Sequence, residues 1–220
     1  MKTKKYYRVK TSTRNLVIAA FLIFIALVSA NAQSLKGGIV LGVTSGDVKI
    51  DRSFTNVMSG KNIMGAEAGF FLKAKLGPVF VKPELLYEFR TGTVQTPSDQ
   101  TYSFENPEQS VTFNMHNLEV PVLFGLHLLG PLYAEGGPMY NYVIAVTQNY
   151  NSNIVDLNRN AFGYRIGGGL DLGALSLHVH YQGMTYGEGN NGASFQDPRR
   201  MIFGLNFALG VKEKRAKPVQ

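Results

Sequence analysis

The sequence contains no cysteine. This absence excludes disulfides, thiolate catalysis, cysteine-ligated zinc and a lipid anchor on an N-terminal cysteine. Two enzyme signatures are also missing or incomplete. The chain has no G-x-S-x-G nucleophile motif. Its segment 187–192 matches the G-x-G-x-x-G spacing of dinucleotide-binding loops, but no helix is expected after it, so we interpret it as a turn.

The uncharged stretch at 16–30 is shorter than the roughly 20 residues that a membrane-spanning helix needs. It follows a basic segment and ends in Ala30-Asn31-Ala32, which has the small-residue pattern of a signal-peptide cleavage site. We therefore expect a secretory signal peptide over residues 1–32, cleaved between Ala32 and Gln33. A retained signal anchor is the alternative.

The excess of positive charge belongs mostly to this segment. Removing its six basic residues lowers the formal net charge from +7 to +1. The mature chain then lacks the basic surface that nucleic-acid binding needs, so no nucleic-acid partner is expected. The remaining length predicts one domain over 33–211, followed by a basic periplasmic tail at 212–220.

The mature chain is dominated by alternation with a period of two. From 64 to 76 every even-numbered residue is apolar, while Glu67 and Lys73 occupy odd positions, and the pattern restarts over 79–90 after a Gly-Pro turn. This period predicts strands. Runs of about a dozen residues suit a tilted crossing of a bilayer better than a typical globular strand.

The same alternation recurs along the chain and predicts eight strands, near 35–44, 63–75, 79–90, 111–127, 132–144, 161–172, 175–182 and 200–211. An even count fits an all-β, eight-stranded antiparallel up-and-down transmembrane β-barrel. Tight glycine turns alternate with longer polar connections, which are expected near 45–62, 91–110, 147–160 and 184–199. We expect the long loops outside the cell and both termini in the periplasm.

Alternation alone does not identify the inner face, because a soluble lipocalin-like barrel has the same period with an apolar lumen. Glycines favour the charged face as the lumen, since a narrow interior needs small residues. Those on the charged face are Gly38, Gly42, Gly65, Gly69, Gly125, Gly137, Gly163, Gly167, Gly169 and Gly204. Aromatic residues on the apolar face are expected near strand ends, as interfacial girdles. They are Tyr87, Phe89, Tyr140, Tyr142, Phe162, Tyr164 and Tyr181.

The predicted lumen carries acids and bases in near balance. They are Glu67, Lys73, Lys82, Glu84, Glu88, Arg90, Glu119, Glu135, Arg165, Asp171 and Arg200. Unpaired charges in a tight interior would cost several kcal/mol each, so we predict internal ion pairs that plug the barrel. A narrow porin-like channel for small solutes is the alternative.

Two segments, Lys82-Pro83-Glu84-Leu85-Leu86-Tyr87 and 118–124 (Leu-Glu-Val-Pro-Val-Leu-Phe), precede a glycine-containing strand at 133–142. Together they resemble the PorT-like outer-membrane β-barrel proteins common in Bacteroidetes, over about 35–211. This resemblance implies an eight-stranded barrel of mostly undefined activity, with one branch linked to protein secretion. The chain departs from many outer-membrane barrels in ending with a basic tail instead of an aromatic residue.

We expect no catalytic residues, cofactor or metal. His178 and His180 share a face, but the sequence fixes no third ligand beside them. The expected location is the outer membrane of a Gram-negative bacterium, reached by the general secretion route. The expected role is structural or interactive, with lipid, the barrel assembly machinery and an unidentified protein as partners, the last through the loops or periplasmic rim. An outer-membrane hydrolase is a further alternative.

Overall fold

Eight strands hydrogen-bond in chain order and close into one barrel, with β8 pairing back to β1. The structure, a computed structural model, describes residues 34–52, 58–95, 110–148, 159–186 and 193–213. The strands are β1 (Ser34–Arg52), β2 (Met58–Leu76), β3 (Val79–Gln95), β4 (Ser110–His127), β5 (Leu132–Gln148), β6 (Asn160–Asp171), β7 (Leu175–Tyr186) and β8 (Ala193–Glu213). Every neighbouring pair is antiparallel. The predicted all-β class and eight-strand topology are confirmed.

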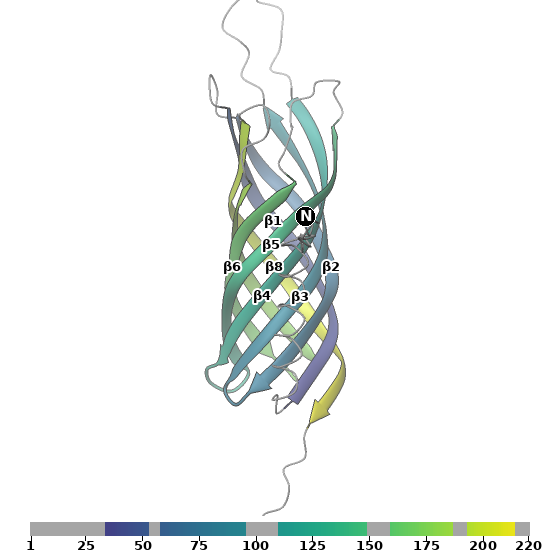
Figure 1. Ribbon diagram of the computed structural model, residues 1–220, viewed down its shortest axis with the longest axis vertical. Coiled ribbons are helices and arrows are strands. Elements are labelled where there is room, and N and C mark those ends of the chain that lie inside the picture. Colours follow the sequence, from purple (N-terminus) through teal and green to yellow (C-terminus); the bar gives the residue numbers. More distant parts are fainter. Residues whose placement is uncertain (1–33, 53–57, 96–109, 149–158, 187–192, 214–220) are drawn as a thin grey trace, which may run out of the picture.

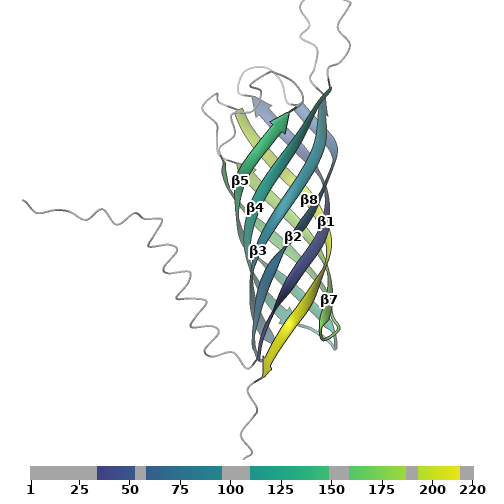
Figure 2. The ribbon, with the colours of Figure 1, turned by 90° about the vertical axis from the view of Figure 1, so that its right-hand side faces the viewer.

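Three tight turns lie together at the bottom of the barrel in Figures 1 and 2, here called the turn end. Each contains a glycine with positive φ: Gly77 at 70°, Gly130 at 56° and Gly173 at 90°. Residues with a Cβ adopt this conformation only at a cost, so glycine favours these turns. The first residues of β1 and the last of β8 lie at the same end. The opposite end is the loop end.

The predicted signal peptide (1–32), its cleavage site and most of the expected tail lie outside the described residues. Residues 187–192 lie outside them as well. Within the described part of the chain, no helix is long and apolar enough to cross a membrane.

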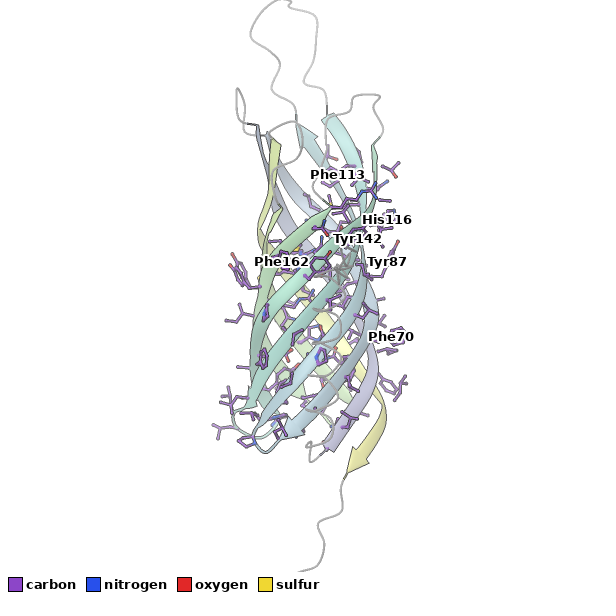
Figure 3. The ribbon with its side chains drawn as sticks, viewed as in Figure 1. Phe70, Tyr87, Phe113, His116, Tyr142 and Phe162 are labelled. Atoms are coloured by element: carbon purple, nitrogen blue, oxygen red, sulfur yellow. The ribbon has the colours of Figure 1, made fainter. Side chains whose placement is uncertain are left out.

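The outer surface is apolar because the strands alternate as the sequence predicts. In β3, exposed Leu85 and Tyr87 alternate with buried Leu86 and Glu88. Elsewhere on the outside, Phe70 is 65% exposed and Phe162 is 70% exposed, and both project from the barrel wall in Figure 3. An exposed apolar surface on this scale is typical of a protein face that meets lipid or a partner.

The strands are longer than the alternation predicts. For example, β1 continues to Arg52 and β3 to Gln95, well past their predicted ends. The expected loop boundaries near 45–62, 91–110, 147–160 and 184–199 were therefore wrong, since each range begins or ends inside a strand. The outward positions of β3 beyond its apolar stretch are polar, as at exposed Thr91 and Thr93. The apolar pattern stops there, although the backbone ladder with β4 continues.

The sequence predicted that the outward aromatic residues lie near strand ends. Because the strands are longer than predicted, this prediction was wrong for some of them. Tyr87 lies near the middle of β3. Tyr140 of β5 packs against Phe162 of β6 with ring centroids 5.2 Å apart. Figure 3 shows Tyr87, Tyr142 and Phe162 in the upper half of the barrel, below the loop end. The apolar outer stretch of β3 from Val79 to this level matches the roughly 9 to 11 residues of a tilted membrane crossing.

The lumen-facing glycines are sites of close approach. A Cβ on Gly167 would collide with the Val179 carbonyl oxygen, and one on Gly125 would collide with the ring of Phe80. Phe80 is 1% exposed and is held by edge contacts to His127 and Tyr133, with ring centroids 5.1 and 5.8 Å away. Its ring therefore has little room to move.

We expect Gly125→Ala to reduce the free energy of unfolding by about 1–3 kcal/mol, because it overpacks this contact. Urea unfolding in lipid vesicles, followed by circular dichroism, measures the change. Combining Gly125→Ala with Phe80→Leu should recover part of the loss. Additive effects of the two substitutions would show that the predicted clash is not what destabilises the barrel.

Candidate functional site

The charged residues predicted for the lumen all project into the barrel. All of them are buried except Asp171, whose side chain is 9% exposed at the turn end. The structure joins them into a central network, a lysine cluster and a rim cluster. These groups follow one another from mid-barrel to the turn end.

Arg165 of β6 is the hub of the central network. Its Nη1 and Nη2 donate to both carboxylate oxygens of Glu67, at 3.2 and 3.0 Å, across 98 residues of sequence. Nη2 also donates to Glu119 Oε2 at 2.8 Å, and Nε donates to Gln182 Oε1 at 2.8 Å. Glu84 Oε2 lies 3.5 Å from Nη1. Since Arg165 is 0% exposed, these pairs act with little solvent screening.

Arg200 of β8 extends the central network. Its Nη2 donates to Glu119 Oε1 at 2.7 Å, and its Nη1 donates to Glu88. Glu88 also accepts from Asn117 Nδ2 at 2.9 Å, while its Oε1 lies 3.9 Å from Arg90 Nε. Glu119 therefore bridges two guanidinium groups from different strands. The planar fork of arginine suits such bidentate and shared contacts.

The lysine cluster lies next to the central network. Lys82 Nζ donates to Glu135 Oε1 at 2.6 Å and lies 3.1 Å from Glu84 Oε1. The Nε2 atom of His180 lies 2.8 Å from the same Glu135 oxygen. Because the other oxygen of Glu84 faces Arg165, this carboxylate connects the two groups.

The rim cluster closes the lumen at the turn end. Asp171 Oδ2 accepts from Lys73 Nζ at 2.9 Å and lies 3.5 Å from His127 Nε2. Lys36 Nζ lies 3.9 Å from Asp171 Oδ1 and donates to the Gly173 carbonyl at 3.1 Å. The Lys73 ammonium also sits 4.1 Å from the ring centre of Phe80. Lysine and aromatic side chains thus fill the opening between the turns.

An apolar plug fills the lumen on the loop side of the central network. Its buried members are Ile63, Phe113, Met115, Met139, Val143, Ala161 and Met184, with Val146 packed against them. Phe113 lies high in the barrel in Figure 3. The plug touches the network where Arg200 Nη2 lies 3.9 Å from Met184 Sδ. Ion pairs and apolar packing therefore occupy successive levels of the lumen.

The two histidines on one face of β7 are buried beside each other. The rings of His178 and His180 stack with centroids 4.5 Å apart. Glu135 adds a carboxylate next to His180, which the sequence alone did not reveal. Nevertheless, among the described residues no group of three or more histidine, aspartate or glutamate side chains is arranged to hold a metal ion.

Sequence reasoning missed several participants. Gln182 and Asn117 occupy lumen-facing positions and donate to network carboxylates. The alternation of the sequence places both residues on the inward face, but the predicted lumen network included only acidic and basic side chains. Lys36 and His127 also alternate inward, yet nothing local indicates that they meet Asp171, which is 135 residues distant from Lys36 in sequence.

A protein-family match agrees with this architecture. The family model described as "outer membrane protein beta-barrel domain" matches residues 31–185. A comparison with curated proteins gave no match. Among solved structures, Neisserial surface protein A is 9% identical with a TM-score of 0.47, covering 77% of this chain and 96% of that one.

Two other solved structures are similar at lower scores. Ail, the attachment invasion locus protein of Yersinia pestis, is 10% identical with a TM-score of 0.33, covering 79% of this chain and 98% of its own. The translocator domain of the autotransporter NalP from Neisseria meningitidis is 10% identical with a TM-score of 0.30. The match covers 89% of this chain and 96% of that domain. The family match spans more than half of the sequence. The chain therefore belongs to the outer membrane protein β-barrel domain family, and its closed barrel is a transmembrane barrel of the outer membrane.

Proposed function

We propose that this protein is a closed outer-membrane barrel with a structural or protein-interaction role, and that it neither conducts solutes nor catalyses a reaction. The observation that supports this role best is the filled lumen. The apolar plug, the central network, the lysine cluster and the rim cluster follow one another through the barrel. An eight-stranded barrel leaves an interior that side chains can fill.

A narrow channel is the competing function, since the lumen is lined with charged groups. In this structure those groups contact one another at ion-pair distances, as Arg165 does with Glu67 and Glu119. A solute would have to separate such pairs, and an uncompensated buried charge costs several kcal/mol. It would also have to displace the apolar plug.

Solute flux into proteoliposomes tests the proposal. We expect vesicles containing the full mature chain to swell in arabinose or glycine no faster than protein-free vesicles. A wide porin reconstituted at the same protein-to-lipid ratio supplies the positive control. Swelling above the protein-free rate would favour the narrow-channel function.

We further propose that the loop end faces the outside of the cell, after export through the general secretion route. The support is the asymmetry of the barrel. Tight turns join strands at one end, whereas β1 to β5 extend at the other end past the level of Tyr87, Tyr142 and Phe162, here called the aromatic belt. Outer-membrane barrels carry their short turns on the periplasmic side. Lipid around the apolar outer surface and the barrel assembly machinery are the partners that this location implies.

Membership in the PorT-like branch, with an accessory role in secretion or envelope assembly, is also a proposal. The two motif segments that resemble this branch lie side by side on β3 and β4, where Pro83 pairs with Val122 and Leu86 with Glu119. They supply Lys82, Glu84 and Glu119 to the lumen. The motifs thus serve the interior of the barrel, and a partner would be recognised elsewhere on its surface.

A further inference from the structure

A hollow in the apolar outer surface lies over β2, here called the Ala68 hollow. Two exposed alanines, Ala66 and Ala68, interrupt the larger outward side chains of Met64 and Phe70 on this strand. The hollow has a volume of about 560 Å³. Its outward lining residues include Leu41 and Val43 of β1, Ala66 and Ala68 of β2, and Tyr87 and Phe89 of β3.

A ridge borders this hollow on the side of β8. Phe203 is 52% exposed, and it lines both the Ala68 hollow and a second hollow of about 320 Å³ over β6 and β7. Its ring therefore stands between two depressions of the surface. Lipid tails are themselves apolar, so association inside a bilayer depends on how closely two surfaces pack. A projecting ring beside a hollow is a shape that another protein surface can match.

The ridge and the hollow are placed symmetrically about β1. Phe203 pairs with Val43, and Ala68 pairs with Leu41. The point midway between Phe203 and Ala68 is therefore Gly42, on β1. When two copies face each other across a two-fold axis through this point, the ridge of each copy meets the hollow of the other. Such a surface is self-complementary, as the interface of a symmetric dimer must be.

A two-fold axis along the membrane normal also requires the ridge and the hollow to lie at the same depth. The strands lean, and β8 runs below β1 in Figure 2. The paired row from Phe203 through Val43 to Ala66 therefore climbs, whereas the two further residues along β2 to Ala68 lead back toward the turn end. With strands about 4.8 Å apart, a rise of about 3.3 Å per residue and a tilt of about 35–45°, the two shifts cancel to within about 2 Å.

The distribution of tyrosine separates this face from the rest of the barrel wall. The outward tyrosines lie on β3, β5, β6 and β7 and are Tyr87, Tyr140, Tyr142, Tyr164 and Tyr181. Strands β8, β1 and β2 contain no tyrosine, and the chain contains no tryptophan. These two residue types anchor a protein surface at the membrane interface. The face centred on β1 therefore lacks the anchors that a lipid-covered face carries elsewhere on this barrel.

We propose that two copies of this protein associate in the membrane through the face centred on β1, with Phe203 of each copy in the Ala68 hollow of the other. Leu41 and Val43, which are 47% and 60% exposed, lie beside the axis and contact the second copy. This inference rests on the proposed interaction role and names a second copy of the chain as a partner. Solute flux does not depend on the association, so the failure of either proposal can be recognised separately.

Cysteine crosslinking of the full mature chain in lipid vesicles locates the interface, because the native chain lacks cysteine. A residue beside a two-fold axis lies close to its own counterpart. We expect Val43→Cys to form disulfide-linked dimers about tenfold faster than Ile166→Cys under the same oxidant. Ile166 is a matched control, since it is 56% exposed on β6, three strands away from β1. Equal rates at the two positions would contradict an interface centred on β1.

Exchanging the ridge and the hollow tests the proposed fit. Energy transfer between copies labelled with donor or acceptor at Ala174→Cys, in the turn after β6, measures association as lipid is added. Phe203→Ala removes the ridge and Ala68→Phe fills the hollow, so each should weaken association about tenfold. The double variant carries its ridge on β2 and its hollow on β8, and it should recover most of the loss.

Phe162→Ala is the control for this exchange, because Phe162 is 70% exposed on β6, away from the proposed interface. It should leave association unchanged, and gel mobility confirms that each variant is folded. A wild-type protein that stays monomeric at every lipid ratio would overturn the proposal. A double variant that associates no better than the single variants would overturn it as well, and lipid would then be the occupant of the hollow.

Discussion

Replacing Arg165 with alanine should lower the free energy of unfolding by about 3–5 kcal/mol, which is the usual cost of removing one partner from a buried ion pair. Arg165 is fully buried, and Glu67 and Glu119 lie 3.0 and 2.8 Å from its Nη2. Without the guanidinium these carboxylates lose a shared partner in a region with weak dielectric screening. Urea titration in lipid vesicles, followed by circular dichroism or gel mobility, gives the difference.

Lys36→Ala is a suitable control for this experiment. Lys36 also belongs to an ion-pair cluster, but its side chain is 16% exposed and lies 3.9 Å from Asp171. Solvent screens this longer, partly exposed pair more than it screens the pairs of Arg165, so the control should lower stability less than Arg165→Ala does. A double variant, Arg165→Met with Glu67→Gln, should recover part of the loss. Equal stability of Arg165→Ala and the parent protein would mean that the central network does not support the barrel.

Arginine at Leu85 should cost about 2–4 kcal/mol if this position meets lipid near the bilayer centre. Leu85 is 49% exposed on the outer face of β3, between the turn end and the aromatic belt. The penalty arises because a guanidinium in hydrocarbon loses its hydration. Leu205→Arg on the outer face of β8 should behave in the same way, since Leu205 is 37% exposed there.

Thr93→Arg is the matched control on the same strand. Thr93 is exposed on the loop side of the belt, where its hydroxyl lies 3.3 Å from that of Thr112. Arginine there reaches water, so we expect a change within about 0.5 kcal/mol. If Leu85→Arg and Thr93→Arg were tolerated equally in vesicles, the apolar outer surface around Leu85 would not be the surface that meets lipid.

The sequence was sufficient to predict the wall of the barrel. Alternation assigns Leu85 outward and Glu84 inward without any tertiary information, because side chains on a strand alternate between faces. The structure agrees, with Leu85 exposed and Glu84 buried. The glycines on the charged face indicated that this face is the lumen. The physical reason is seen at Gly125, where a Cβ would collide with the ring of Phe80.

Partners inside the lumen could not be read from the sequence. Lys73 shares a face with Glu67, but its ammonium pairs with Asp171 instead, 98 residues away. Which charges meet depends on the register between strands and on the stagger that closes the barrel. Glu84 illustrates the difficulty, since its two oxygens face Lys82 and Arg165 from different strands.

The apolar plug and the true strand ends were missed for a related reason. Phe113 and Met115 occupy inward positions of β4, where a rule of polar inside and apolar outside does not predict them. Past the apolar stretch of β3 the outward positions are polar, as at Thr93, so the alternation of apolar and polar residues ends before the hydrogen-bonded pairing with β4 does.

Single-channel recording of the purified mature protein in planar bilayers tests the filled lumen most directly. We expect no resolved conductance steps from the wild-type protein, at either polarity, under conditions in which a wide porin conducts. Removing the hub with Arg165→Ala should allow small or transient openings if the barrel still folds. A steady, large conductance from the wild-type protein would contradict the closed barrel and establish the channel instead.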